Sequence, residues 1–116
     1  MKFLLILNDA PYGIERTYNG LRIAGVLAKR DNVELKIYLM GDAVIAAGSG
    51  QKVPAGCYNA QVMLSSPVKR GAVVGVCGTC MDARGVQEAQ LTEGSHRSNM
   101  EELTDWIVWA DKVISY

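Results

Sequence analysis

Short apolar runs recur along this chain between segments of helical character, and this alternation constrains the fold more than any other feature. The runs with strand character are FLLIL at 3–7, VELKIYLM at 33–40, AVVGVC at 72–77 and KVISY at 112–116. Continuous apolar strands require cover on both faces of their sheet. Strands that alternate with helices form right-handed parallel units. The pattern therefore predicts one α/β/α-layered domain over residues 1–116, built on a mainly parallel sheet.

Helical segments fill the intervals between these strands. Residues 13–29 place their apolar side chains on one broad helical face, and a short helix is expected at 42–47. Another helix begins near Tyr58, and we expect Pro67 to disturb it, because proline cannot sit unkinked inside a helix. Each interval is therefore long enough to return the chain for a parallel strand.

The last helix has a recognisable start. In SNMEEL, Ser98 is followed three positions later by Glu101, which is the capping-box pattern. We therefore expect Ser98 to be the N-cap of this helix. Its buried stripe is expected to contain Met100, Leu103, Ile107 and Ala110.

Charge and hydropathy exclude several classes of protein. The 116 residues contain 12 basic and 12 acidic side chains, so the net charge is zero and no basic stripe predicts nucleic-acid binding. The apolar start MKFLLIL changes to NDAPYG without a small-residue cleavage site, which favours a buried strand over a signal peptide. No apolar run is long enough to cross a bilayer. We therefore expect a cytoplasmic protein with no membrane segment.

Three segments that follow predicted strands are expected to meet. They are NDAPYG at 8–13, GDAVIAAGSGQKVPAG at 41–56 and the end of VVGVCGTCMDARGV at 73–86. In open parallel sheets, ligands bind at the carboxyl ends of the strands. The three segments therefore predict one functional rim with Cys77 at its centre.

Cys77 and Cys80 form a C-x-x-C motif, for which a metal site is one interpretation. Structural zinc is held by four ligands, usually in two pairs. Only Cys57 and His96 remain in this chain as further cysteine or histidine ligands, and neither has a paired partner. We therefore expect neither a metal nor another cofactor.

A dithiol redox centre is the second interpretation. A C-x-x-C motif that follows a strand and opens a helix gains a stabilised thiolate from the helix N-terminus. Against this, Gly85 lies five residues after Cys80, and the order of elements differs from that of thioredoxin. A buried cysteine that simply ends a strand is a further alternative for Cys77.

The third interpretation is a nucleophile that carries sulfur as a persulfide. Such a thiolate needs nearby positive charge or backbone N–H groups, and it needs no general base when its pKa is already low. We expect Arg84 and the amides from Gly78 onward to stabilise the Cys77 thiolate. The only histidine, His96, lies far away in sequence. Cys80 is a candidate resolving thiol or, equally, a structural residue.

A few other residues complete the predicted site. We include Asp82, Asp9 and Tyr12, with Gly78, among the substrate- or anion-stabilising residues. Asp9 is also a common turn former, and packing accounts equally well for Tyr12. Cys57 is expected to pack at the start of a helix.

Five separated segments resemble the DsrE/DsrF-like family, most closely its YchN-like branch. These segments are NDAPYGIERTYNGLRIA, LKIYLMGDAVIAAGSGQK, YNAQVML, VCGTCMDARGV and WADKVISY. The spacing of Cys77, Arg84 and Gly85 matches the family pattern. In sulfur-relay members, the cysteine at the position of Cys77 carries the persulfide. The resemblance also implies a sheet of four or five strands and a homohexamer.

The residues after Cys77 distinguish this chain from the relay members. Those members typically continue with small apolar residues and form hetero-oligomers, whereas this chain has Gly-Thr-Cys-Met-Asp. The resemblance therefore implies intracellular sulfur transfer through Cys77, with unidentified donor and acceptor proteins, and not tRNA thiolation in particular. The alternatives are a non-enzymatic small-ligand-binding or assembly protein, and a dithiol redox protein that uses Cys77 and Cys80.

Overall fold

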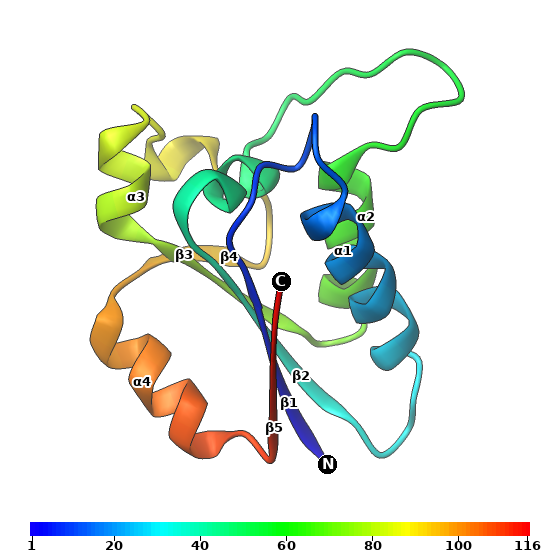
Figure 1. Cartoon of the computed structure of the whole chain (residues 1–116), viewed down its shortest axis with the longest axis vertical. Coiled ribbons are helices and arrows are strands. Elements are labelled where there is room, and N and C mark those ends of the chain that lie inside the picture. Colours follow the sequence, from blue (N-terminus) through cyan, green and yellow to red (C-terminus); the bar gives the residue numbers. More distant parts are fainter.

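A five-stranded parallel sheet lies at the centre of the structure, a computed structural model that describes residues 1–116 (Figure 1). The strands lie side by side in the order β4-β3-β2-β1-β5, and every neighbouring pair is parallel. In chain order the elements are β1 (Lys2–Leu7), α1 (Arg16–Leu27), β2 (Glu34–Leu39), the 3-10 helix η1 (Gly41–Ala47), α2 (Ala60–Lys69), β3 (Val73–Cys77), α3 (Gly78–Ala83), the 3-10 helix η2 (Glu88–Gln90), β4 (Ser95–Ser98), α4 (Met100–Trp109) and β5 (Lys112–Ser115).

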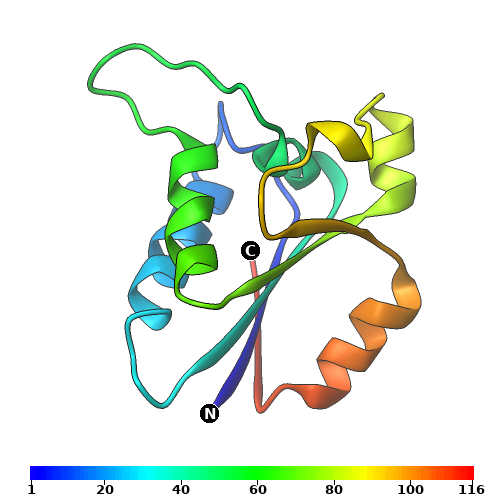
Figure 2. The same ribbon diagram turned by 180° about the vertical axis from the view of Figure 1, so that it is seen from behind.

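Helices cover both faces of this sheet. Figures 1 and 2 show α1 and α2 together on one face and α4 alone on the other, with α3 at the carboxyl ends of the strands. Tyr38 meets the Trp106 ring edge-on, so Tyr38 and its neighbour Gly75 face α4. The alternate residues Ile37 and Val74 are completely buried on the opposite face. The predicted α/β class and parallel sheet are therefore confirmed.

One strand of the sheet was not expected from the sequence. Strand β4 consists of SHRS, which has neither an apolar run nor β-branched residues. It forms an edge of the sheet and pairs only with β3. Its polar composition is compatible with an edge position, and it places Arg97 and Ser98 beside the end of β3.

The expected disturbance at Pro67 does not end α2. The helix begins after Asn59, whose side chain accepts a hydrogen bond from the Val62 N–H, and it continues to Lys69. Pro67 therefore lies in the last turn, where its missing N–H deprives only one carbonyl, that of Met63, of an intrahelical partner. None of the helices combines the length and the apolar character needed to span a bilayer.

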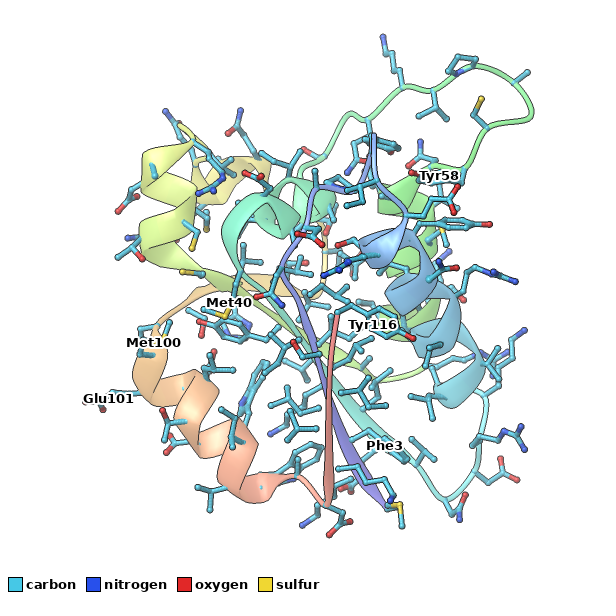
Figure 3. All side chains as sticks on the ribbon, in the orientation of Figure 1. Phe3, Met40, Tyr58, Met100, Glu101 and Tyr116 are labelled. Atoms are coloured by element: carbon cyan, nitrogen blue, oxygen red, sulfur yellow. The ribbon has the colours of Figure 1, made fainter.

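The predicted start of the last helix is wrong by one residue. Asn99 is the N-cap of α4 and accepts a hydrogen bond from the Glu102 N–H at 2.9 Å, while Ser98 still belongs to β4. The buried stripe differs accordingly: Trp106 is buried, whereas Met100 and Ile107 are 54% and 43% exposed. Figure 3 shows Met100 at the outer side of the α4 start. SNMEEL contains two adjacent capping residues, and the pairing of β4 with β3 selects the second.

Candidate functional site

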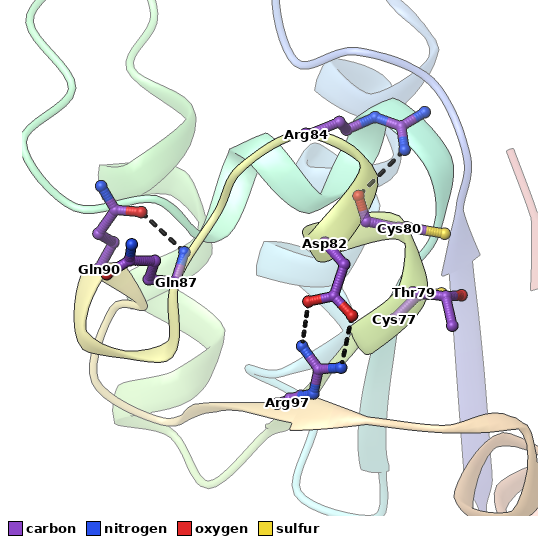
Figure 4. A network of polar contacts seen from close by, with 8 residues as sticks. All are labelled: Cys77, Thr79, Cys80, Asp82, Arg84, Gln87, Gln90 and Arg97. Atoms are coloured by element: carbon purple, nitrogen blue, oxygen red, sulfur yellow. Dashed lines mark hydrogen bonds and ion pairs between the residues drawn. The ribbon is translucent and has the colours of Figure 1, made fainter.

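Cys77 lies at the junction between β3 and α3. It is the last residue of β3, and α3 begins directly afterwards at Gly78, which makes Cys77 the N-cap residue. Cys80 lies within the first turn of this short helix (Figure 4). Residue Cys77 is only 3% exposed, whereas Cys80 is partly exposed. Neither cysteine is in a disulfide.

The two thiols have opposite electrostatic environments. Burial raises the pKa of Cys77, but hydrogen bonds from the side chains of Cys80 and Thr79 and from their backbone amides outweigh it and lower the pKa overall. The Thr79 hydroxyl lies 3.4 Å from the Cys77 sulfur. Burial and the hydrogen bond to Cys77 raise the pKa of Cys80. Cys77 is therefore the more acidic thiol of the pair.

Backbone and side-chain contacts fix the position of Cys80. The Gly41 N–H, at the start of η1, donates a hydrogen bond to the Cys80 sulfur at 3.2 Å. The Arg84 guanidinium donates to the Cys80 carbonyl at 3.1 Å and pairs with Asp42 at 2.9 Å. Arg84 forms no hydrogen bond to Cys77, so the structure places this predicted cation against the second cysteine instead.

Arg97 is a site residue that the sequence analysis missed. Its two terminal nitrogens donate to the two Asp82 carboxylate oxygens at 2.8 and 2.9 Å (Figure 4), and this lowers the pKa of Asp82. A side chain at Gly78 would meet this guanidinium, because an added Cβ would lie 2.9 Å from its central carbon. Gly78 therefore allows β4 to approach the start of α3. Only recognition of β4 as a strand beside β3 would have indicated Arg97.

A cavity of about 560 Å³ opens beside Cys77. Its lining contains Cys77 and Thr79 at the start of α3, Arg97 from β4, Glu88 from η2 and Met100 from α4. Such a volume lies within the range of small-molecule binding sites. Because Cys77 is otherwise buried and belongs to this lining, the cavity is the candidate route for a reactant.

A polar network supports one wall of this cavity. Glu102 accepts hydrogen bonds from the Ser98 hydroxyl and from the His96 ring when its Nε2 carries the proton. Burial raises the pKa of Glu102, but the bonds from Ser98 and His96 outweigh it, so the pKa is lowered overall. The Tyr38 hydroxyl donates to the Asn99 carbonyl at 3.1 Å. These contacts tie the end of β4 to the start of α4.

The first loop does not contribute to this cavity. Asp9 lies 3.7 Å from Arg16 in an ion pair. The Tyr12 hydroxyl donates to Gln51 and accepts a hydrogen bond from the Ala60 N–H at 2.9 Å. The structure therefore brings together the predicted residues at the end of β3 and in α3, whereas Asp9 and Tyr12 lie outside the cavity lining.

The third cysteine, Cys57, does not belong to the cavity lining. Cys57 is exposed in the loop before α2, so the expectation that it packs at the helix start is wrong. The structure contains no group of three or more histidine, cysteine or acidic side chains arranged to hold a metal ion.

Comparison with known proteins places this architecture in a family. The model of the DsrE/DsrF-like family matches residues 1–116. This chain belongs to the DsrE/DsrF-like family. Among its relatives, Protein YchN of Escherichia coli K12 is 39% identical over 116 residues, which cover 99% of this chain and 98% of YchN. Protein MJ0989 of Methanocaldococcus jannaschii is 37% identical over the full length of both chains.

Solved structures agree with this DsrE/DsrF-like assignment. The crystal structure of YchN from E. coli superposes with a TM-score of 0.93 at 38% identity and covers 100% of this chain and 99% of its own. MTH1491 of Methanobacterium thermoautotrophicum has a TM-score of 0.74 at 14% identity, with 99% of this chain and 97% of its own covered. At this low sequence identity, the similarity to MTH1491 concerns the fold alone.

Proposed function

We propose that this protein is a persulfide carrier in intracellular sulfur transfer, with Cys77 as the residue that accepts the sulfur. The observation that carries the proposal is a cysteine of lowered pKa in the lining of an open cavity, at the junction between β3 and α3. A resemblance supports the same residue, because sulfur-relay members of the DsrE/DsrF-like family carry the persulfide at the position of Cys77. The proposal places the protein in the cytoplasm, where thiols remain reduced.

The loading step is a displacement at sulfur. The Cys77 thiolate attacks the outer sulfur of a donor persulfide, R–S–SH, and the bond between the two donor sulfurs breaks. The products are the Cys77 persulfide and the donor thiolate, so no external oxidant or reductant is required. Thr79 and the first amides of α3 stabilise the attacking thiolate. The lowered pKa of Cys77 allows attack without a general base.

Two routes remove the carried sulfur. An acceptor thiolate that enters the cavity beside Cys77 attacks the outer sulfur, which transfers it and regenerates the Cys77 thiolate. Alternatively, the Cys80 thiol attacks the inner sulfur, which forms the Cys77–Cys80 disulfide and releases hydrogen sulfide. Burial of Cys80 raises its pKa, which disfavours the second route.

A dithiol oxidoreductase is the second candidate function. It is favoured by the position of Cys77 and Cys80 across the first turn of α3 and by the unequal pKa values of their thiols. This function requires a reversible disulfide between the two residues and turnover with a reductant. A carrier instead retains added sulfur until a thiol removes it.

We also propose that the chain assembles as a homohexamer, as the family resemblance implies. Large apolar side chains lie exposed on two helices: Val108 of α4 is 81% exposed, and Val62 of α2 is 63% exposed. Burying such side chains between copies is favourable. Light scattering coupled to gel filtration tests the assembly, and a mass that corresponds to a single chain at micromolar concentration contradicts it.

A sulfur-release assay tests the carrier function. Reduced protein is incubated with a small persulfide, separated from the reagent by gel filtration and mixed with excess thiol, and the released sulfide is measured. We expect release from the wild type and none from Cys77→Ser, with circular dichroism and native mass unchanged. Equal release from both proteins contradicts the proposal, and loss of the fold in the variant indicates a structural cysteine.

A further inference from the structure

The approach to Cys77 limits the size of its reaction partner. The residue is only 3% exposed, and it lines a cavity of about 560 Å³. Small-molecule sites of about 300–1,000 Å³ enclose most of their ligand. A free small molecule fills this space, whereas a folded donor protein would have to insert a cysteine side chain into it. The cavity therefore fits a low-molecular-weight sulfur donor better than a protein surface.

One wall of the cavity presents hydrogen-bond donors in a fixed position. A guanidinium carries five N–H donors, and two of those on Arg97 are used by Asp82. The remaining three form no hydrogen bond within the chain. The two bonds to Asp82 and the close approach to Gly78 hold the guanidinium in place. Planar, pre-positioned donors of this kind are suited to a carboxylate.

A second residue of the lining has the opposite charge. Glu88 is an exposed residue of η2 that lines the cavity and takes part in none of the ion pairs of the chain. The acidic groups that contact the lining from behind are already bonded: Glu102 to His96 and Ser98, and Asp82 to Arg97. A ligand with one positive and one negative group therefore matches this lining better than a simple anion.

We infer that the cavity beside Cys77 binds a small zwitterionic persulfide of the amino-acid thiol class, with its carboxylate on Arg97 and its ammonium group on Glu88. The inference rests on the proposed function and names the class of donor. The Cys77 thiolate takes the outer sulfur of this donor, the donor's S–S bond breaks, and the free amino-acid thiolate leaves. Arg97 and Glu88 determine which donor binds, while Cys77 is the residue that accepts the sulfur.

Protection of Cys77 from alkylation tests the binding site without any sulfur transfer. The probe is S-methylcysteine, a zwitterionic thioether that cannot transfer sulfur, and iodoacetamide labelling is followed at the Cys77 peptide. We expect saturable protection by S-methylcysteine and none by the uncharged 2-(methylthio)ethanol. Arg97→Gln and Glu88→Gln should each weaken the protection about tenfold, the effect of one charge-assisted contact.

Matched controls separate binding from unfolding. Arg22→Gln on α1 and Glu101→Gln on α4 remove the same charges outside the cavity, so their protection should equal that of the wild type. The labelling rate without ligand identifies any variant whose site is disrupted. Because Glu88 is exposed, its substitution keeps the test valid if Arg97→Gln misfolds.

The outcomes for the two proposals are distinct. Protection by S-methylcysteine without any sulfur loading supports the zwitterion site and contradicts the carrier function. Sulfur loading without protection, or equal protection by the uncharged thioether, overturns the zwitterion site and leaves the carrier function standing. Protection that is unaffected in both cavity variants overturns the roles of Arg97 and Glu88.

Discussion

Hydrogen bonds from Cys80 and Thr79 outweigh burial and lower the pKa of Cys77. The Thr79 hydroxyl lies 3.4 Å from its sulfur, and the nearby Cys80 thiol and the backbone amides of Thr79 and Cys80 also lower its pKa. The cation expected from the sequence, Arg84, instead bonds to Cys80 and Asp42. Hydrogen-bond donors at fixed positions favour the thiolate form of Cys77.

The hydrogen bond from the Thr79 hydroxyl contributes to the lowered pKa of Cys77, and this contribution can be tested. In Thr79→Val the thiolate loses one donor at nearly constant side-chain volume, so the pKa of Cys77 rises toward its ordinary value. The midpoint of the pH–rate profile for iodoacetamide labelling at Cys77 should move to higher pH, and labelling near neutral pH should slow several-fold. Thr104→Val, on the exposed side of α4, is the control and should leave the profile unchanged. An unaltered midpoint in Thr79→Val contradicts the role of the hydroxyl.

Two substitutions at Cys80 separate its electrostatic role from a resolving role. Serine retains a hydroxyl donor toward Cys77 but cannot form a disulfide, whereas alanine removes both properties. We follow the pH–rate profile for iodoacetamide labelling at Cys77. We expect its midpoint in Cys80→Ser to lie near that of the wild type, and its midpoint in Cys80→Ala to lie at higher pH. Both variants should hold a loaded persulfide at least as long as the wild type. Faster sulfur loss from both variants contradicts the resolving role.

At the scale of elements, the sheet and α4 fit together through a glycine. A Cβ at Gly75 would lie 3.0 Å from the rings of both Tyr38 and Trp106, which pack between β3 and α4. Gly75→Ala should therefore destabilise the protein by about 1–3 kcal/mol through overpacking. Gly25→Ala in α1 is the matched comparison, because its Cβ would meet nothing within 4 Å. That change should stabilise the protein by about 0.5–1 kcal/mol.

Urea denaturation of the two alanine variants measures both effects under one set of conditions. The account expects the unfolding midpoint of Gly75→Ala to fall and that of Gly25→Ala to rise, with similar slopes. A Gly75→Ala variant as stable as the wild type would contradict the close contact between β3 and α4.

The junction between β4 and α4 should make stability depend on acid pH. The pKa of Glu102 is lowered in the folded protein from an ordinary value of 4.5, so its contribution is present above that value and is lost as the pH falls through the lowered one. Thermal unfolding followed from pH 7 downward should show less acid destabilisation in Glu102→Gln than in the wild type. Glu101→Gln, at an exposed position, is the control. Identical acid profiles for Glu102→Gln and the wild type contradict this contribution.

The elements that the sequence predicted are those with an apolar signal. The runs at 3–7, 33–40, 72–77 and 112–116 correspond to β1, β2, β3 and β5, since mainly apolar runs of this length are typical of strands in a covered parallel sheet. SHRS has no such signal, since an edge strand can be polar and its pairing depends on β3 alone. Because β4 was not predicted, Arg97 was not identified as a site residue.

Convergence of the loops could be predicted only in part. Three loops do follow neighbouring strands, and the turn after β2 reaches the cysteines through the Gly41 N–H. The loop after β1 instead turns toward α2, where the Tyr12 hydroxyl meets Ala60 and Gln51. Strand order places loops at one edge of a sheet, but side-chain contacts along each loop decide which way it turns.

For the whole molecule, the chemistry is concentrated at one end of the sheet. Cys77 lies at the carboxyl edge, where α3, β4 and the start of α4 surround a single cavity. The other two layers, α1 with α2 and the body of α4, support this edge by burying the sheet faces (Figures 1 and 2). This arrangement fits a small carrier domain that presents one reactive sulfur to successive partners.

The central claim is that Cys77 carries a transferable sulfur, and an intact-mass measurement tests it most directly. Reduced protein is incubated with a sulfane-sulfur donor, desalted and measured by mass spectrometry, and the modified peptide is then mapped. We expect a gain of one sulfur atom on the Cys77 peptide that a reducing thiol removes. No gain, with Cys77 also unreactive toward iodoacetamide in the folded protein, would contradict the account and indicate a structural cysteine.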